Sequence, residues 1–187
     1  RNELREFMGS LQPRADQGVA LRLNFSIPEG WELIPIPAGD MDEGLTPEGI
    51  RLEPVDVANP ETQIIITRGT AADYAGLNMP LEEGDPVIAL EPIAAAILES
   101  GELGSRLRVE PLQLGTLDGA FATLRGEELT VRAYLFATGL PDDWVLMLAS
   151  APSADFNAFN RAALREVLGS LEPAAGGSIL DRPLTLT

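Results

Sequence analysis

Paired carboxylates are the side chains of this sequence that come closest to an acid–base catalyst. The candidate pairs are Glu82/Glu83, Glu127/Glu128 and Asp142/Asp143. Two carboxylates act as acid and base only when both face one cleft at a defined separation. Neighbouring residues of a strand point to opposite faces, and neighbouring residues of a turn are usually solvated. We therefore expect no catalytic site at these pairs.

Other catalytic chemistries lack their residue types. The chain has no His and no Cys, and each of its 13 basic residues is Arg. This excludes thiolate nucleophiles, zinc–thiolate sites, imidazole bases and lysine Schiff bases. Ser105, Ser150 and Ser153 lie outside any nucleophile-elbow sequence. The sequence predicts a protein that is not an enzyme; the alternative is a hydrolase that uses carboxylates alone.

An acidic, Gly-rich segment at 37–49 carries Asp40, Asp42 and Glu43. Alternating carboxylates are suitable oxygen ligands for Ca²⁺. The twelve-residue calcium loop needs Gly at position six and Glu at position twelve, where a count from Asp40 gives Leu45 and Arg51. These three residues are weak metal candidates, and we expect a solvated loop with no metal or cofactor.

A segment that could contact a partner lies at 71–86. Its apolar residues follow neither a helical nor a strand period, and they are Tyr74, Leu77, Met79 and Leu81. Long loops with apolar residues either fold back on the core or contact a partner. We treat these four residues as partner-contact candidates and leave both alternatives open.

The net charge of −16 limits the classes of partner that the protein is expected to bind. Nucleic acids and anionic membranes both require a positive surface, so neither is an expected partner. The longest apolar stretch, 87–98, is interrupted by Glu91 and Pro92 and is too short to span a bilayer. Trp31 and Trp144 each begin a predicted strand, where we expect them to pack in the core.

These residues must be positioned by a mixed α+β fold. Hydrophobic alternation and turn residues predict strands at 20–27, 31–37, 50–57, 62–69, 106–115, 120–127, 129–139 and 144–152. Turns are expected at 117–119 and 141–143. One helix is expected within 86–100, capped by Asp85 or begun by Pro92. An amphipathic helix at 154–171 closes the unit.

The two ends of the chain repeat one another. Residues 1–13 and 161–173 are identical at eight of thirteen positions, with the same helical spacing of apolar residues. Chance similarity between two Leu- and Arg-containing helices is one interpretation. The other is a tandem array, in which 1–18 is the C-terminal helix and linker of a preceding unit. Residues 19–173 are then one domain, and 174–187 are the linker and first strand of a following unit. The terminal segments 1–11 and 179–187 would then mediate self-association.

Three segments resemble the PsbP-like family. They are FSIPEGW at 25–31, LGTLDGAFATLRG at 114–126 and DFNAFNRAALREVLGSL at 155–171. The resemblance implies an α/β/α sandwich with a central, mainly antiparallel sheet, a fold shared with DcrB-type periplasmic proteins, a Ran-binding import factor and secretion chaperones. It also implies a noncatalytic protein-binding or assembly module outside the cytoplasm, periplasmic or at the cell surface. A cytoplasmic, secretion-chaperone-like adaptor of the same fold is the alternative.

Overall fold

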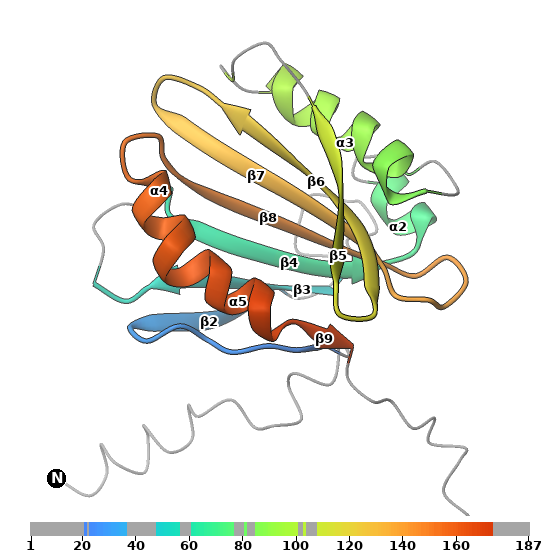
Figure 1. The fold of residues 1–187 in the computed structure, drawn as a ribbon, viewed down its shortest axis with the longest axis horizontal. Helices are drawn as coiled ribbons and strands as arrows, with labels where there is room; N and C mark the ends of the chain where they lie inside the picture. The colour runs from blue at the N-terminus through green and yellow to red at the C-terminus, as the bar shows by residue number, and fades with distance from the viewer. Residues whose placement is uncertain are drawn as a thin grey trace, which may run out of the picture.

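The computed structural model describes residues 21, 23–36, 48–56, 61–76, 81, 85–100, 103 and 108–173, and the structural statements below concern these residues. Their largest element is a seven-stranded sheet in the order β2-β3-β4-β8-β7-β6-β5, in which every neighbouring pair is antiparallel (Figure 1). The strands are β2 Trp31–Ile36, β3 Glu48–Pro54, β4 Gln63–Gly69, β5 Val109–Leu114, β6 Leu117–Arg125, β7 Leu129–Ala137 and β8 Trp144–Pro152.

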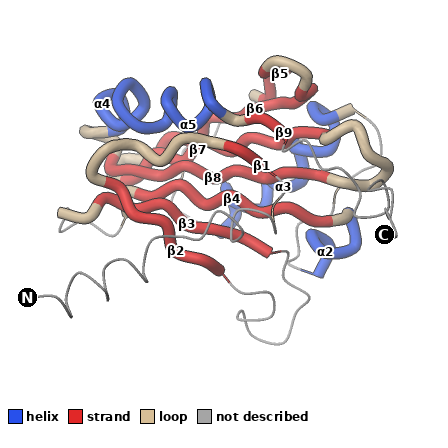
Figure 2. Tube along the Cα trace, turned by 90° about the horizontal axis from the view of Figure 1, so that it is seen from below, coloured by secondary structure: helices blue, strands red, loops and turns tan. Residues whose placement is uncertain are grey.

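Helices lie on both faces of this sheet (Figure 2). On one face lies α3, Pro86–Ser100, with the short helix α2, Ala71–Gly76, at the end of β4. The other face is covered by a continuous helical segment composed of α4 Phe156–Phe159, a π-helical turn at Asn160–Leu164 and α5 Arg165–Ser170. The predicted α/β/α sandwich with an antiparallel sheet is confirmed.

Two apolar clusters fill the space between the layers, because successive side chains of a strand point to opposite faces. In β7, Leu135 packs with α3, whereas its neighbour Phe136 packs with the closing helix. The predicted apolar face of that helix is buried, with Leu164 and Val167 fully inaccessible. Leu168 is only partly buried.

The first strand is much shorter than predicted. Instead of spanning 20–27, β1 comprises Leu23–Asn24 and pairs with β9, Glu172–Pro173, in a separate two-stranded sheet. Leu23 is buried and Asn24 is exposed, so alternation holds only briefly before the chain leaves regular structure ahead of Pro28. The pairing brings the beginning and the end of the domain side by side.

The turn predicted at 117–119 is also misplaced. The β5–β6 turn consists of Gly115 and Thr116, where Gly115 has a φ of 57° that favours glycine. Gly119 lies inside β6 instead. A Cβ atom there would stand 2.4 Å from Cδ1 of Phe136, so the glycine permits close packing and does not make a turn.

The helix predicted within 86–100 spans that range, and Asp85 caps it. The Val87 N–H donates to Oδ1 of Asp85 at 2.8 Å. Pro92 lies inside the helix and does not begin it. The predicted strands 50–57 and 62–69 are present as β3 and β4, which pair antiparallel, and the predicted turn at 141–143 joins β7 to β8.

Candidate functional site

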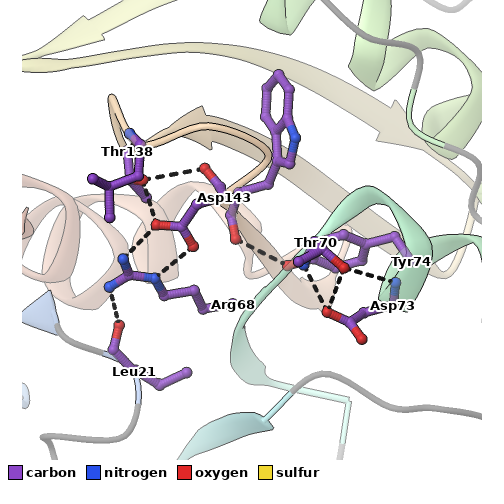
Figure 3. A network of polar contacts seen from close by, with 9 residues as sticks. Leu21, Arg68, Thr70, Asp73, Tyr74, Thr138 and Asp143 are labelled. Carbon is purple, nitrogen blue, oxygen red and sulfur yellow. Dashed lines mark hydrogen bonds and ion pairs between the residues drawn. The ribbon is translucent and has the colours of Figure 1, made fainter.

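The carboxylate of Asp143, which directly precedes β8, lies at the centre of a network of polar contacts (Figure 3). Arg68, near the end of β4, donates from Nε to Oδ1 of Asp143 at 2.9 Å and from Nη2 to Oδ2. The two side chains are only 12% and 19% exposed. The hydroxyl of Thr138 also donates to Oδ2. Arg68 further donates from Nη1 to the carbonyl oxygen of Leu21 at 2.7 Å. One ion pair therefore joins β4, the β7–β8 turn and the start of the domain.

Asp142, the other member of this predicted carboxylate pair, faces a different partner. Its φ of 49° belongs to the left-handed region, and its side chain is exposed. Oδ1 of Asp142 accepts a hydrogen bond from the Ala71 N–H at 2.8 Å, at the first turn of α2. The two carboxylates thus act separately, Asp143 in an ion pair and Asp142 at a helix start.

The other two candidate pairs show no such organisation. Glu127 and Glu128 are both exposed in the β6–β7 connection. Glu82 and Glu83 lie outside the described residues.

Helix α2 corrects the expectation of an irregular segment at 71–86. Thr70 and Asp73 form a reciprocal cap, in which the Thr70 N–H donates to Oδ2 of Asp73 at 2.7 Å and the Asp73 N–H donates to the Thr70 hydroxyl at 3.3 Å. This capping box satisfies N–H groups that a helix start otherwise leaves without partners. The signal was present in the sequence as Thr-x-x-Asp, ahead of the apolar Tyr74.

Tyr74 is buried, so its side chain is not an exposed contact residue in this structure. Its hydroxyl lies 3.2 Å from Oγ1 of Thr67 and 3.1 Å from the Thr67 carbonyl oxygen. Burial raises the pKa of Tyr74 well above its usual value, and the nearby carboxylates of Asp73 and Asp143 raise the pKa of Tyr74 further. The phenol is therefore a neutral core group.

Leu81 also packs against the cluster that contains Tyr74 and is partly buried. Both residues thus follow the alternative in which the segment folds back on the core. The other two partner-contact candidates, Leu77 and Met79, lie outside the described residues.

The two tryptophans and two of the candidate serines make contacts that stabilise the fold. Trp31 stacks on Phe159 with ring centroids 5.8 Å apart, and Trp144 is buried in the apolar cluster that also contains residues of α3, so the predicted core packing of both indoles is confirmed. The hydroxyl of Ser150 donates to the Glu61 carbonyl oxygen at 2.7 Å. Ser153 donates to the Gly126 carbonyl oxygen at 2.8 Å. Ser105 lies outside the described residues.

Metal binding at Asp40, Asp42 and Glu43 also falls outside the described residues. Within the part of the chain that the structure describes, no group of three carboxylates is arranged to hold a metal ion. No helix among those residues has the length and apolar character needed to cross a bilayer.

Sequence reasoning missed the ion pair of Arg68 with Asp143. The two residues are separated by 75 positions, and neither lies in a recognisable motif. The antiparallel register of β4 with β8 places Arg68 opposite Val145, two residues beyond Asp143. This register is set by tertiary pairing, so the sequence offered no local signal for the contact.

Comparisons with known proteins identify relatives of the fold. No family model matches the sequence, and no curated protein matches it in sequence. One similar solved structure is LpqN of Mycobacterium tuberculosis, which is involved in cell envelope biogenesis; the TM-score is 0.51 at 13% identity, over 80% of this chain and 81% of that chain. Another is the cyanobacterial PsbP, CyanoP, of Synechocystis, with a TM-score of 0.51 at 9% identity over 82% of this chain and 87% of that chain.

Proposed function

The chain has a PsbP-like fold, and from this premise we propose that it is a noncatalytic, extracytoplasmic protein-binding or assembly module that forms one unit of a tandem array. The fold similarity carries the proposal, because it extends over about four-fifths of the chain and includes an envelope-biogenesis protein. A shared fold does not transfer one partner. The class of function therefore rests on the fold, and the partner is left to experiment.

The types of residue in the chain support the proposal that the protein is not an enzyme. The sequence contains no His, Cys or Lys, which removes the usual nucleophiles and bases. The carboxylates of the polar network have structural partners, since Asp143 pairs with Arg68 and Asp73 caps α2. Both carboxylates therefore stabilise the fold, as is expected of a domain that binds a partner without catalysis.

The sheet edges indicate how a partner would bind. The two edge strands are β2 and β5, and each carries a proline, Pro35 and Pro111. Proline lacks the N–H that an added strand would need, and natural proteins use it to protect sheet edges. We therefore expect the partner to contact side chains of this domain, not to extend its sheet.

The arrangement of β1 and β9 supports a tandem array. These strands pair, so the domain begins and ends at the same place. In the sequence repeat, Pro13 corresponds to Pro173, and residues 14–18 would link the last strand of one unit to the next unit, which begins at residue 19. A linker of this length keeps successive units close together.

The proposal is tested with the natural full-length protein in its own cells. After chemical crosslinking and fractionation, we expect the protein in the envelope fraction, together with one protein enriched in stoichiometric amount over a folded control bait of equal net charge. An exclusively cytoplasmic protein would contradict the localisation. Turnover of ester, peptide, glycoside or phosphate substrates that is abolished by a single carboxylate substitution would show an enzyme instead.

A further inference from the structure

We propose that Arg132 is the centre of a carboxylate-binding site on the sheet face beside α4. The site goes beyond the proposed function, because a carboxylate can bind there whether or not the chain assembles with a protein. Its carboxylate can come from a small free acid or from an acidic residue of another protein. Three observations carry the proposal: the fixed orientation of the guanidinium, its aromatic surroundings and its lack of a described counter-ion.

Neutral acceptors hold the guanidinium in place. Arg132 lies within β7 opposite Thr123 of β6, and its Nε donates to the Thr123 hydroxyl at 2.9 Å. Its Nη1 donates to Oδ1 of Asn160 at 3.2 Å. One strand and one helix therefore orient the same side chain. A group that is already oriented loses less entropy when it binds a ligand.

Asn160 is the first residue of the π-helical turn in the closing helix. Such turns are rare and occur frequently at functional sites. The turn interrupts the α-helix at the residue that reaches Arg132. A local feature of the helix thus coincides with the contact that orients the guanidinium.

Aromatic rings flank the guanidinium. Its Cζ atom lies 5.9 Å from the ring centroid of Phe121 and 5.3 Å from that of Phe156. Tyr134 stacks on Phe121, and Arg132 acts to lower the pKa of Tyr134, although burial of this phenol has the larger and opposite effect. The phenol oxygen thus accepts a hydrogen bond from Arg132 and helps to hold the guanidinium in place. Flanking apolar rings also strengthen a charge-assisted hydrogen bond by excluding water.

Arg132 has no carboxylate partner among the described ion pairs. Within the described residues, Arg51, Arg68 and Arg108 lie within 4.0 Å of a carboxylate oxygen. The described arginines without such a contact are the exposed Arg125, Arg161 and Arg165 and the half-buried Arg132. A guanidinium has five N–H donors; those on Arg132 serve the Thr123 hydroxyl, Oδ1 of Asn160 and the Tyr134 hydroxyl, which leaves donors for a ligand. Burying part of a charge without a counter-ion is costly, so a ligand that supplies one is favoured.

The chemistry of the site selects a carboxylate. A guanidinium is planar and binds a carboxylate through two parallel N–H groups. One positive charge matches a monoanion, whereas a phosphate dianion would need further cations that no described ion pair places at Arg132. The net charge of −16 repels anions over long range, but salt screens this repulsion beyond roughly 8 Å.

Side-chain NMR of the ¹⁵N-labelled protein tests the site. We expect the Nε–H resonance of Arg132, assigned by its loss in Arg132→Lys, to shift saturably with millimolar sodium acetate but not with sodium chloride at equal ionic strength. The melting temperature should rise with acetate over chloride in the wild type and not in Arg132→Lys, because Lys keeps the charge but lacks the planar pair of donors. Arg125→Gln is the matched control, since Arg125 is exposed on the adjacent strand, and it should respond as the wild type does.

Two further probes separate the sources of the carboxylate. An end-blocked peptide with one internal Glu should saturate the resonance at a lower concentration than acetate if the ligand is a protein side chain, and at the same concentration if it is a small acid. Absence of a saturable shift with both probes would overturn the site and show that Arg132 only packs between rings. Saturation by inorganic phosphate alone, or an unchanged melting response in Arg132→Lys, would also overturn it. If Arg132→Lys fails to fold, the Nε–H resonance of Arg132 is assigned instead through bonds from its backbone amide, and the wild-type titration then decides, with Arg125→Gln as the reference. None of these outcomes bears on envelope localisation or partner capture, so the two proposals fail separately.

Discussion

Replacing Asp143 by Ala is expected to destabilise the domain by about 3 kcal/mol, because it leaves a largely buried guanidinium without its counter-ion. Arg68 would lose two hydrogen bonds, and the Thr138 hydroxyl would lose its carboxylate acceptor. Urea denaturation measures the change. Glu127→Ala is the control, since Glu127 is exposed and its loss should change stability by less than about 0.5 kcal/mol. Equal effects of the two substitutions would show that the ion pair contributes little.

The only two tyrosines of the chain, Tyr74 and Tyr134, should resist ionisation in the folded state, since burial raises the pKa of both. The folded state favours the neutral phenols, so their contribution to stability is complete below about pH 10 and is lost as the pH rises above it. An ultraviolet titration should therefore show tyrosinate forming together with unfolding, as followed by circular dichroism. The chain in denaturant should titrate near the ordinary value. Ionisation near pH 10 with the fold intact would contradict the burial of the tyrosines.

At the scale of elements, two glycines should respond oppositely to the same substitution. Gly119→Ala in β6 would place a Cβ atom 2.4 Å from the Phe136 ring and 2.7 Å from the Leu135 carbonyl oxygen. We expect a loss of about 2 kcal/mol from this overpacking. Gly169→Ala in α5 meets nothing within 4 Å and should stabilise the helix by ~0.5 kcal/mol. Guanidinium denaturation of both variants provides the comparison, and a tolerated Gly119→Ala would contradict the close approach of β6 and β7.

The two copies of the repeated sequence should differ in importance. Deleting 161–173 removes the buried Leu164, Val167 and Leu171 together with β9, so the domain should not fold. Deleting 1–13 should leave a folded domain, because the tandem interpretation assigns that segment to a preceding unit. Circular dichroism and thermal melts compare the two deletions. If both are equally destructive, residues 1–13 belong to this domain and the tandem interpretation is wrong.

At the scale of the whole molecule, the adjacency of β1 and β9 predicts that the domain tolerates circular permutation. A short Gly/Ser linker joining Pro173 to Leu21, with new ends at the exposed turn between Gly115 and Thr116, should give a cooperatively folded protein. The control opens the chain between Leu135 and Phe136, both fully buried in β7, and should not fold. A thermal melt with near-ultraviolet circular dichroism distinguishes the two. Failure of the first permutant would contradict the pairing of the domain ends.

The sequence by itself determined the class of fold and most of its elements. Strands 129–139 and 144–152 and the helix within 86–100 were predicted correctly, because alternation, helical spacing and capping residues are local signals. The exclusion of thiolate, imidazole and lysine chemistry likewise follows from composition alone, because the chain has no Cys, His or Lys. The core packing of Trp144, which is buried, and of Trp31, which is partly buried, was predictable because large rings at strand starts usually pack in the core.

Tertiary structure decided the positions that depend on distant partners. Gly119 was assigned to a turn because its local sequence suits one, yet the Phe136 ring on the neighbouring strand determines its role. For Tyr74 the sequence left partner contact and folding back on the core as alternatives, and the packing of α2, which brings its hydroxyl to the Thr67 carbonyl oxygen, decides for the core. The ion pair of Asp143 with Arg68 and the hydrogen bond from Arg132 to Asn160 form only when the strands and helices are assembled. Contacts across such separations depend on register and packing, which a linear pattern of residue types does not specify.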